Sequence, residues 1–218
     1  MTLKLQKQSV LIQDLGLIDY QKAYEIQKQW VDQVINGHDA VLILCEHPSV
    51  LTLGRLASLK NFMIPKDAIE KKGIDILDID RGGEVTLHSP GQLVVYPILD
   101  LRNYGKDLKR YLQGLEQVAI DLLKDFGILA DRFLGRTGVW VGPDKIVSMG
   151  IGVKKWVSFH GLAINVNTDL SLFNLIKPCG LNVQMTSIGK INSEKVKMEV
   201  VKERLIERFC EHFQLRKV

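Results

Sequence analysis

Residues 139–166, VWVGPDKIVSMGIGVKKWVSFHGLAINV, decide the fold class of this chain. They contain apolar segments at 139–141, 146–153 and 156–166, and Gly142-Pro143-Asp144 between the first two is typical of a hairpin turn. No helical pattern separates these segments, so strands follow one another directly instead of alternating with helices. The stretch therefore favours an α/β or α+β domain with a mixed sheet.

Helix and strand patterns on both sides extend this prediction. Further strands are expected at 40–45, 74–79 and 93–101. Helices are expected from Asp19 to about Ile35, at 65–72, at 108–126, as one turn at 172–176, and at 196–213. Because no repeat and no Pro/Gly/Ser-rich linker interrupts the chain, we expect a single domain over residues 1–218, with helices flanking the sheet.

Composition excludes several classes of protein. The chain has 218 residues, of which 46% are hydrophobic and 25% charged, as in ordinary globular proteins. No apolar run approaches the roughly 20 residues that span a bilayer, and the first residues lack a secretory signal, so a cytoplasmic protein without a membrane partner is expected. A net charge of +4 is too small to indicate nucleic-acid binding, although it is compatible with an acidic protein partner.

The three cysteines, Cys45, Cys179 and Cys210, are too widely spaced for a zinc ribbon or a disulfide framework. Cys45 ends an apolar strand and Cys210 lies in the last predicted helix, so both are expected to be packing residues. Cys179 lies in the sequence Lys177-Pro178-Cys179-Gly180, between elements. A loop exposes a thiol and a neighbouring lysine lowers its pKa, which makes Cys179 a candidate nucleophile.

Two glycine-containing segments carry the other candidate site residues. In 81–92, RGGEVTLHSPGQ, paired glycines allow close approach to a bound group, and His88 precedes a second tight loop. Lys145 opens an apolar strand and is followed by Ser148-Met149-Gly150, and His160-Gly161 lies in another strand. Each feature has a structural alternative: a decorated hairpin turn, a solvated lysine and a core histidine. No cluster has metal-ligand spacing and no phosphate-binding loop is present.

Several ordered motifs together carry a resemblance that covers 47–180. They are HPSVLTLGR (47–55), RGGEVTLHSPGQLVVYPILDL (81–101), GVWV (138–141), KIVSMGI (145–151), FHGLAINVNTDL (159–170) and PCG (178–180). In this order and spacing the sequence resembles the lipoyl(octanoyl) transferases of lipoate biosynthesis. The resemblance implies a fold similar to the biotin and lipoate protein ligases, with a mixed sheet and surrounding helices.

The resemblance also implies an activity and its residues. An octanoyl group would pass from octanoyl-acyl carrier protein to a lysine of a lipoyl domain, by way of a thioester on Cys179. A Lys145 ammonium would favour the Cys179 thiolate, and a neutral Lys145 could accept a proton from the incoming amine. The matching substrate-binding positions are Arg81, Gly82, Gly83, Glu84, Val85, Thr86, Leu87, His88, Ser148, Met149, Gly150, Gly161, Leu162 and Ala163.

Partners and departures follow from the same resemblance. The acceptors would be the lipoyl domains of 2-oxoacid dehydrogenase E2 subunits and the glycine cleavage H protein. No cofactor and no metal are expected, and a monomer is the default expectation, which the sequence itself does not establish. Leu87 stands where the family usually has an aromatic residue, and Ser89 where it usually has glycine. Both departures leave the reaction type intact and make the preferred acyl-chain length uncertain.

Three other functions fit parts of the pattern. An ATP-dependent lipoate or biotin ligase would share the fold and need no nucleophilic cysteine. A cysteine hydrolase would pair its thiol with a histidine, such as His88 or His160. A non-catalytic carrier-binding module would contain an inert Cys179. ATP dependence, donor hydrolysis without an acceptor, and insensitivity to thiol alkylation distinguish these alternatives from the transferase.

Overall fold

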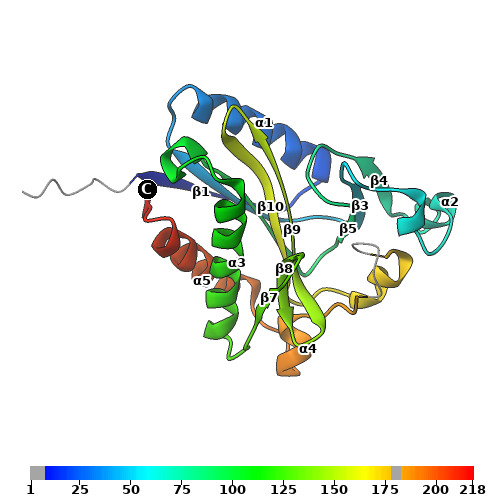
Figure 1. Ribbon diagram of the computed structural model, residues 1–218. Coiled ribbons are helices and arrows are strands. Elements are labelled where there is room, and N and C mark those ends of the chain that lie inside the picture. Colours follow the sequence, from blue (N-terminus) through cyan, green and yellow to red (C-terminus); the bar gives the residue numbers. More distant parts are fainter. Residues whose placement is uncertain (1–7, 178–182) are drawn as a thin grey trace, which may run out of the picture.

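An eight-stranded mixed sheet forms the centre of the fold (Figure 1). The computed structural model describes residues 8–177 and 183–218. The strands of this sheet are β1 (Ser9–Leu17), β2 (Ala40–Glu46), β6 (Gln92–Ile98), β7 (Asp131–Phe133), β8 (Arg136–Val141), β9 (Asp144–Lys154), β10 (Val157–Asn165) and β11 (Arg216–Lys217). Their order is β11-β1-β2-β6-β10-β9-β8-β7, with β1 parallel to both neighbours and all other pairs antiparallel.

A second, three-stranded sheet lies beside the first and has the order β4-β3-β5. Its strands are β3 (Val50–Leu53), β4 (Asp75–Asp78) and β5 (Val85–His88). The segment 79–84, which contains the paired glycines, connects β4 to β5, and Gly82 within it donates its N–H to Ile151 of β9 in the large sheet. The small sheet thus positions the RGG segment at the edge of a pocket.

Helices cover both faces of the large sheet (Figure 1). The α-helices are α1 (Tyr20–Ile35), α2 (Lys66–Glu70), α3 (Leu108–Asp125), α4 (Ile188–Asn192) and α5 (Met198–His212). Short 3-10 helices occupy Leu59–Asn61, Leu101–Tyr104 and Leu170–Leu175. Asp19 caps α1 by accepting a hydrogen bond from the Lys22 N–H, as expected from the sequence. None of the helices in the described part of the chain is long and apolar enough to cross a membrane.

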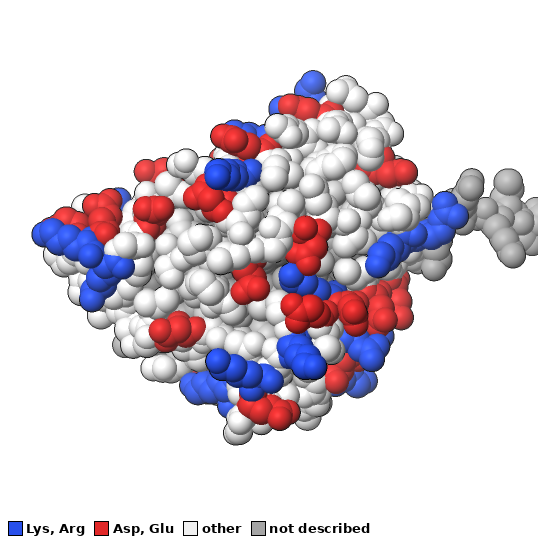
Figure 2. Space-filling view, turned by 180° about the vertical axis from the view of Figure 1, so that it is seen from behind, with Lys and Arg blue, Asp and Glu red and all other residues white. Residues whose placement is uncertain are grey.

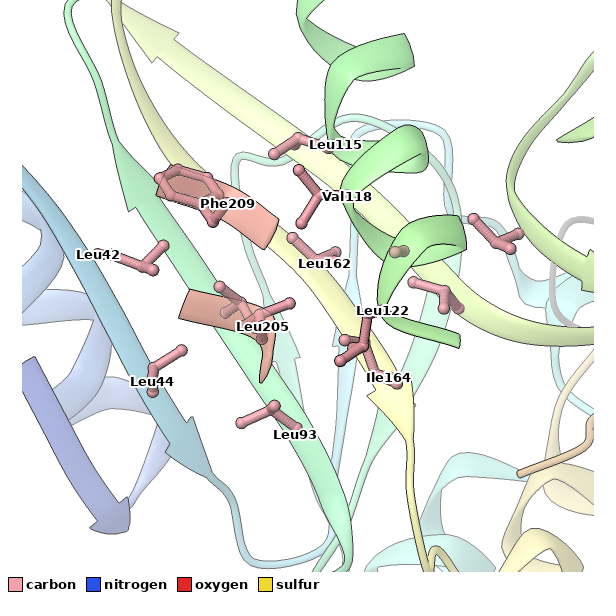
Figure 3. Packing of buried hydrophobic residues seen from close by; sticks show 14 of the residues in the cluster. Leu42, Leu44, Leu93, Leu115, Val118, Leu122, Leu162, Ile164, Leu205 and Phe209 are labelled. Atoms are coloured by element: carbon pink, nitrogen blue, oxygen red, sulfur yellow. The ribbon is translucent and has the colours of Figure 1, made fainter. Parts of the chain in front are cut away.

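Alternation along β2 sends apolar side chains into two separate cores, because successive strand residues point to opposite faces. Leu42 and Leu44 pack with α3 and α5 on one face, where Leu205 and Phe209 of α5 are fully buried (Figure 3). Val41, Ile43 and Cys45 point to the other face and pack with α1. The side chains on the α1 face become small where the pocket lies.

The mixed sheet and its flanking helices are confirmed. The long helices and the run of strands from β8 to β10 lie where the sequence predicts them, and the expected turn at 172–176 is part of the 3-10 helix at Leu170–Leu175. Val50–Leu53, which the sequence pattern did not predict as a strand, forms β3 and is buried along its whole length. The sequence pattern also did not predict β1, β5, β7, β11 or α4. Strands are determined by their pairing partners more than by local sequence.

Candidate active site

A pocket lies on the α1 face of the large sheet, between its central strands and the RGG segment. It is lined by Lys145 and by the predicted substrate-binding residues except Gly82 and Leu87, together with Tyr20, Val94, Tyr96 and His160. Gly82 instead donates its N–H to the Ile151 carbonyl at 2.9 Å, and Leu87 is fully buried among the apolar residues under the small sheet. The structure therefore brings together nearly all of the positions that the sequence singled out.

The floor of the pocket consists of small residues on neighbouring strands. Ser148 of β9 lies opposite Ala163 of β10, and Gly150 lies opposite Gly161. Since these side chains rise little from the sheet, they leave space that larger residues would fill. Val94 adds an apolar wall from β6. The arrangement suits a slender apolar group lying along the sheet.

Lys145 lies at the start of β9 and is only 3% exposed. Its main chain is bonded on both sides to the segment after residue 182: the Lys145 N–H donates to the Gln184 carbonyl, and the Thr186 N–H donates to the Lys145 carbonyl, each at 2.9 Å. Lys145 and Met185 consequently form an isolated parallel bridge. The strand that carries the lysine is thus fixed to the chain that follows Cys179 in sequence.

The Lys145 side chain runs between a glycine and an indole. Its Nζ lies 5.3 Å from the centre of the Trp140 ring, within the range of a cation–π contact. A Cβ atom built on Gly138 would lie 2.6 Å from Lys145 Cε and 3.2 Å from Nζ. Any side chain at position 138 would therefore displace the lysine.

The RGG segment is fixed by its arginine. Arg81 is buried and donates from Nη2 to the Thr52 carbonyl at 2.6 Å and to Thr52 Oγ1 at 2.9 Å. The following peptide contacts β9 closely: a Cβ atom on Gly150 would lie 2.8 Å from the Gly82 carbonyl oxygen. Two glycines, Gly83 at φ +86° and Gly150 at the close approach, are therefore required for the upper wall of the pocket.

A chain of buried amides connects the Lys145 strand to His88. A carbonyl oxygen can only accept, so Asn165 donates from Nδ2 to the Thr186 carbonyl (3.0 Å). Asn165 Oδ1 then accepts from Gln92 Nε2 (2.9 Å). Gln92 Oε1 therefore faces His88 Nδ1 at 2.8 Å, and that ring nitrogen carries the proton. Burial lowers the pKa of His88 well below its usual range, so the ring is neutral. It presents an unprotonated Nε2.

A second group of aromatic rings closes the pocket around His160. This residue has φ +54° inside β10, and its N–H donates to Gln27 Oε1 at 2.8 Å. Its ring stacks on Tyr24 with an interplanar angle of 6°, while Nε2 lies 2.8 Å from Asp80 Oδ1 and Nδ1 lies 3.4 Å from the Tyr20 hydroxyl. Burial lowers the pKa of His160, although the Asp80 carboxylate opposes the shift.

His47 extends the same polar cluster. Its Nε2 lies 2.8 Å from the Tyr96 hydroxyl and its Nδ1 lies 2.7 Å from the Ile18 carbonyl, which must accept, so Nδ1 carries the proton. Burial lowers the pKa of His47 and raises that of Tyr96, so both are neutral near pH 7. Neither Tyr20 nor Tyr96 was predicted as a site residue, because each belongs to a helix or strand whose sequence pattern indicates only a core element.

The cysteines separate into two groups. Burial raises the pKa of the Cys45 thiol, which is the state of an inert packing residue, as expected. Cys210 is partly buried in α5 against the core. Cys179, the predicted nucleophile, lies outside the described residues. Within 8–177 and 183–218, no group of three or more His, Cys, Asp or Glu side chains has the geometry to hold a metal ion.

Comparison with known proteins shows the family of this chain. Residues 19–210 match the family described as the lipoyl protein ligase A/B catalytic domain. An octanoyltransferase of Solibacter usitatus is 46% identical over 203 residues, covering 93% of this chain and 90% of the relative. An octanoyltransferase of Caldicellulosiruptor bescii is 45% identical over 195 residues, covering 88% of this chain and 86% of the relative.

Solved structures show the same fold at low identity. A putative lipoate protein ligase from T. acidophilum with bound lipoic acid superposes with a TM-score of 0.73 at 16% identity, covering 98% of this chain and 88% of that one. A biotin protein ligase from Aquifex aeolicus in complex with biotin and ATP superposes with a TM-score of 0.60 at 14% identity, covering 94% and 70%. By sequence match and by fold, the chain belongs to the lipoyl protein ligase A/B catalytic domain family, among its octanoyltransferases.

Proposed function

We propose that this chain, an acyltransferase by its family, transfers an octanoyl group from octanoyl-acyl carrier protein to a lysine of lipoyl domains, through a thioester on Cys179. The observation that carries the proposal is Lys145. Its amine lines an apolar, glycine-floored pocket, and its main chain is bonded to Gln184 and Thr186, shortly after Cys179 in the chain. A lysine held this way lies in the pocket where the proposed thioester would react.

The chemistry divides into two attacks. In the first, the Cys179 thiolate attacks the donor carbonyl carbon, the bond from that carbon to the carrier thiol breaks, and the leaving thiolate takes a proton. In the second, the acceptor lysine amine attacks the new thioester. The bond to Cys179 breaks, an amide forms, and Lys145 receives the proton that the amine loses. Exchange of one thioester for another is nearly thermoneutral, whereas amide formation runs downhill without ATP.

The pocket supports each requirement of these steps. Ser148, Gly150, Gly161 and Ala163 leave a slot for an extended acyl chain. The neutral rings of the His47–His88–His160 cluster add hydrogen-bonding groups without charge, so they do not oppose an apolar chain as ions would. The acceptors are the lipoyl domains of 2-oxoacid dehydrogenase E2 subunits and the H protein, and the enzyme acts as a cytoplasmic monomer.

Docking of the carrier protein is not explained by charge alone. In the C-terminal region Lys202 pairs with Asp14 and Arg204 pairs with Glu207, so these cations are already engaged. Figure 2 shows basic and acidic side chains interspersed over one face of the molecule, without a broad area of one sign. We expect the carrier to be recognised mainly through its acyl chain and the residues at the pocket mouth.

The decisive experiment uses octanoyl-acyl carrier protein without ATP and without acceptor. Intact mass spectrometry should show one octanoyl adduct that hydroxylamine removes and that maps to Cys179. Cys179→Ser should lose the adduct, and Cys210→Ser should keep it. If no adduct forms and a lipoyl domain is modified only when ATP and free octanoate are supplied, the chain is a ligase like its structural neighbours.

The role of Lys145 is tested separately. Arginine retains the positive charge but does not give up its proton, so Lys145→Arg should abolish transfer to the lipoyl domain. Transfer at the unaltered rate in Lys145→Arg would show that another group accepts the proton. Measurement of thioester formation in the same variant separates activation of the thiol from proton transfer in the second step.

A further inference from the structure

Glu116 is an acidic residue in an otherwise apolar position. It lies on the buried face of α3 and is only 7% exposed, between Leu115 and the core-facing Val118. A carboxylate that far from water requires partners, because burial of an unpaired charge is strongly unfavourable. No part of the proposed chemistry uses Glu116, and no sequence motif contains it.

The two carboxylate oxygens of Glu116 have different partners. Oε2 accepts from Arg132 Nε at 3.1 Å, in an ion pair at the rim of the helix. Oε1 accepts from the main-chain N–H of Gly138 at 3.1 Å, and that bond is buried. Arg132 also donates to the Gln113 carbonyl, so it remains anchored to α3 independently of Glu116. The bond to Gly138 is the one directed toward the pocket.

Gly138 lies directly against the Lys145 side chain. Its φ of +125° is open to glycine and rarely to other residues, and a Cβ atom there would lie 2.5 Å from the Val147 carbonyl and 2.6 Å from Lys145 Cε. The β8–β9 register shifts between Val139 and Trp140. Gly138 precedes the Val139–Val147 pair next to this irregularity, and its N–H is bonded to the Glu116 side chain.

From this connection we infer that Glu116 is a positioning residue: its bond to Gly138 holds the peptide against which the Lys145 stem packs and so keeps the amine between Gly138 and the Trp140 ring. The inference rests on the proposed role of Lys145. Glu116 touches neither substrate nor the reacting atoms. It acts through the main chain of Gly138, so no pattern of residue spacing in the sequence predicts the connection.

The test compares two substitutions of Glu116 that differ in whether the side chain can accept a hydrogen bond from Gly138. Glu116→Gln retains an oxygen that accepts from Gly138, whereas Glu116→Leu has a similar volume and no acceptor. Glu116→Leu should lower kcat for transfer to the lipoyl domain by about 10- to 100-fold, the usual effect of misplacing a catalytic group by about 1 Å, with KM for the carrier within about twofold. Glu116→Gln should restore kcat to within about threefold of the unsubstituted enzyme. Arg132→Gln is the matched control for the ion pair and should leave kcat in that same range.

A second readout separates positioning from general destabilisation. Competitive acetylation followed by peptide mass spectrometry should show increased reactivity of Lys145 in Glu116→Leu. Lys154, which is paired with Asp32 on the surface, serves as the internal reference and should be unchanged. If Glu116→Leu does not fold, Gly138→Ala tests the packing of Lys145 against residue 138 directly, because its methyl group would occupy the space of Lys145 Cε.

Each outcome supports or overturns the inference. Loss of kcat in the leucine variant with rescue by glutamine supports it, whereas full activity in Gly138→Ala overturns it, because the packing of Lys145 against residue 138 would then not matter. A folded Glu116→Leu enzyme with unaltered kcat overturns it, as does equal impairment of the leucine and glutamine variants. If Lys145→Arg is fully active, the proposed function itself fails. If Lys145→Arg is inactive and Glu116→Leu is active, only the role of Glu116 fails.

Discussion

Replacing Gly150 by alanine places a methyl group against the backbone that covers the pocket. The new Cβ would lie 2.8 Å from the Gly82 carbonyl oxygen and 3.1 Å from Arg81 Cδ. Gly150 does not have a positive φ, so the backbone of β9 itself accepts alanine without strain. The whole effect therefore arises from the RGG segment, which has to move away from the sheet.

The size of the effect follows from three contributions. Overpacking a closely packed site destabilises by about 1–3 kcal/mol. Weakening the bond from Gly82 N–H to the Ile151 carbonyl, 2.9 Å long, removes about 0.5–1.5 kcal/mol. Alanine lowers the conformational entropy of the unfolded chain, which stabilises the folded state by about 0.4–1 kcal/mol. The free energy of unfolding should therefore fall by about 2 kcal/mol, equivalent to about 4–8 °C in Tm for a protein of this size.

Activity should fall further than stability, because Arg81 and its neighbours line the pocket. We expect kcat/KM for octanoyl transfer to drop by about 10- to 100-fold. Urea unfolding and steady-state transfer to a lipoyl domain measure the two effects. Gly82→Ala is the control for stability, since its Cβ would lie 3.6 Å from the Ile151 carbonyl oxygen, an ordinary contact. If Gly150→Ala is as stable and active as the unsubstituted enzyme, the RGG segment does not press on β9 as described.

Three further outcomes are expected. Gln92→Leu should lower the free energy of unfolding by about 3 kcal/mol in urea, because it leaves His88 Nδ1–H and other buried polar groups unpaired; a loss below about 1 kcal/mol would argue against the amide chain. Burial lowers the pKa of His47, His88 and His160, so the unfolded chain binds more protons than the folded chain at acidic pH. The free energy of unfolding should therefore be constant above about pH 6.5 and decline below it. A urea midpoint independent of pH between 5 and 8 would contradict this. Phe209→Ala should cost about 3–5 kcal/mol in urea while kcat of the folded fraction is retained; a loss under about 1 kcal/mol would mean the core collapses around the gap.

The fold class could be predicted from local pattern alone, since Leu108–Asp125 has a clear apolar stripe and 139–166 contains strands without intervening helices. The pairing of β1 with β2 could not, because parallel partners far apart in sequence leave no local signal. β3 was missed for a related reason. Its four residues are buried by the small sheet and by the residues under it, and only that context makes them a strand.

Site residues that lie in sequence motifs could be predicted, whereas residues brought to the site by the packing of helices against the sheet could not. Arg81 and His88 follow from the glycine-rich segment and the resemblance, and both line the pocket. Tyr20 and Glu116 carry no motif. Tyr20 reaches the pocket because α1 crosses the sheet there, and Glu116 reaches Gly138 because α3 packs beside β8. Such residues become visible only when the elements are placed against one another.

The left-handed backbone at His160 couples strain in the pocket wall to the packing of one ring. A non-glycine residue at φ +54° carries about 1–2 kcal/mol of strain that glycine would relieve. Glycine would also remove a ring that is almost fully buried, stacks on Tyr24 and lies 2.8 Å from Asp80, and the loss of a buried aromatic ring costs about 3–5 kcal/mol. A library screened for heat resistance should therefore retain histidine at position 160, as should a library screened for turnover, although the backbone there is strained.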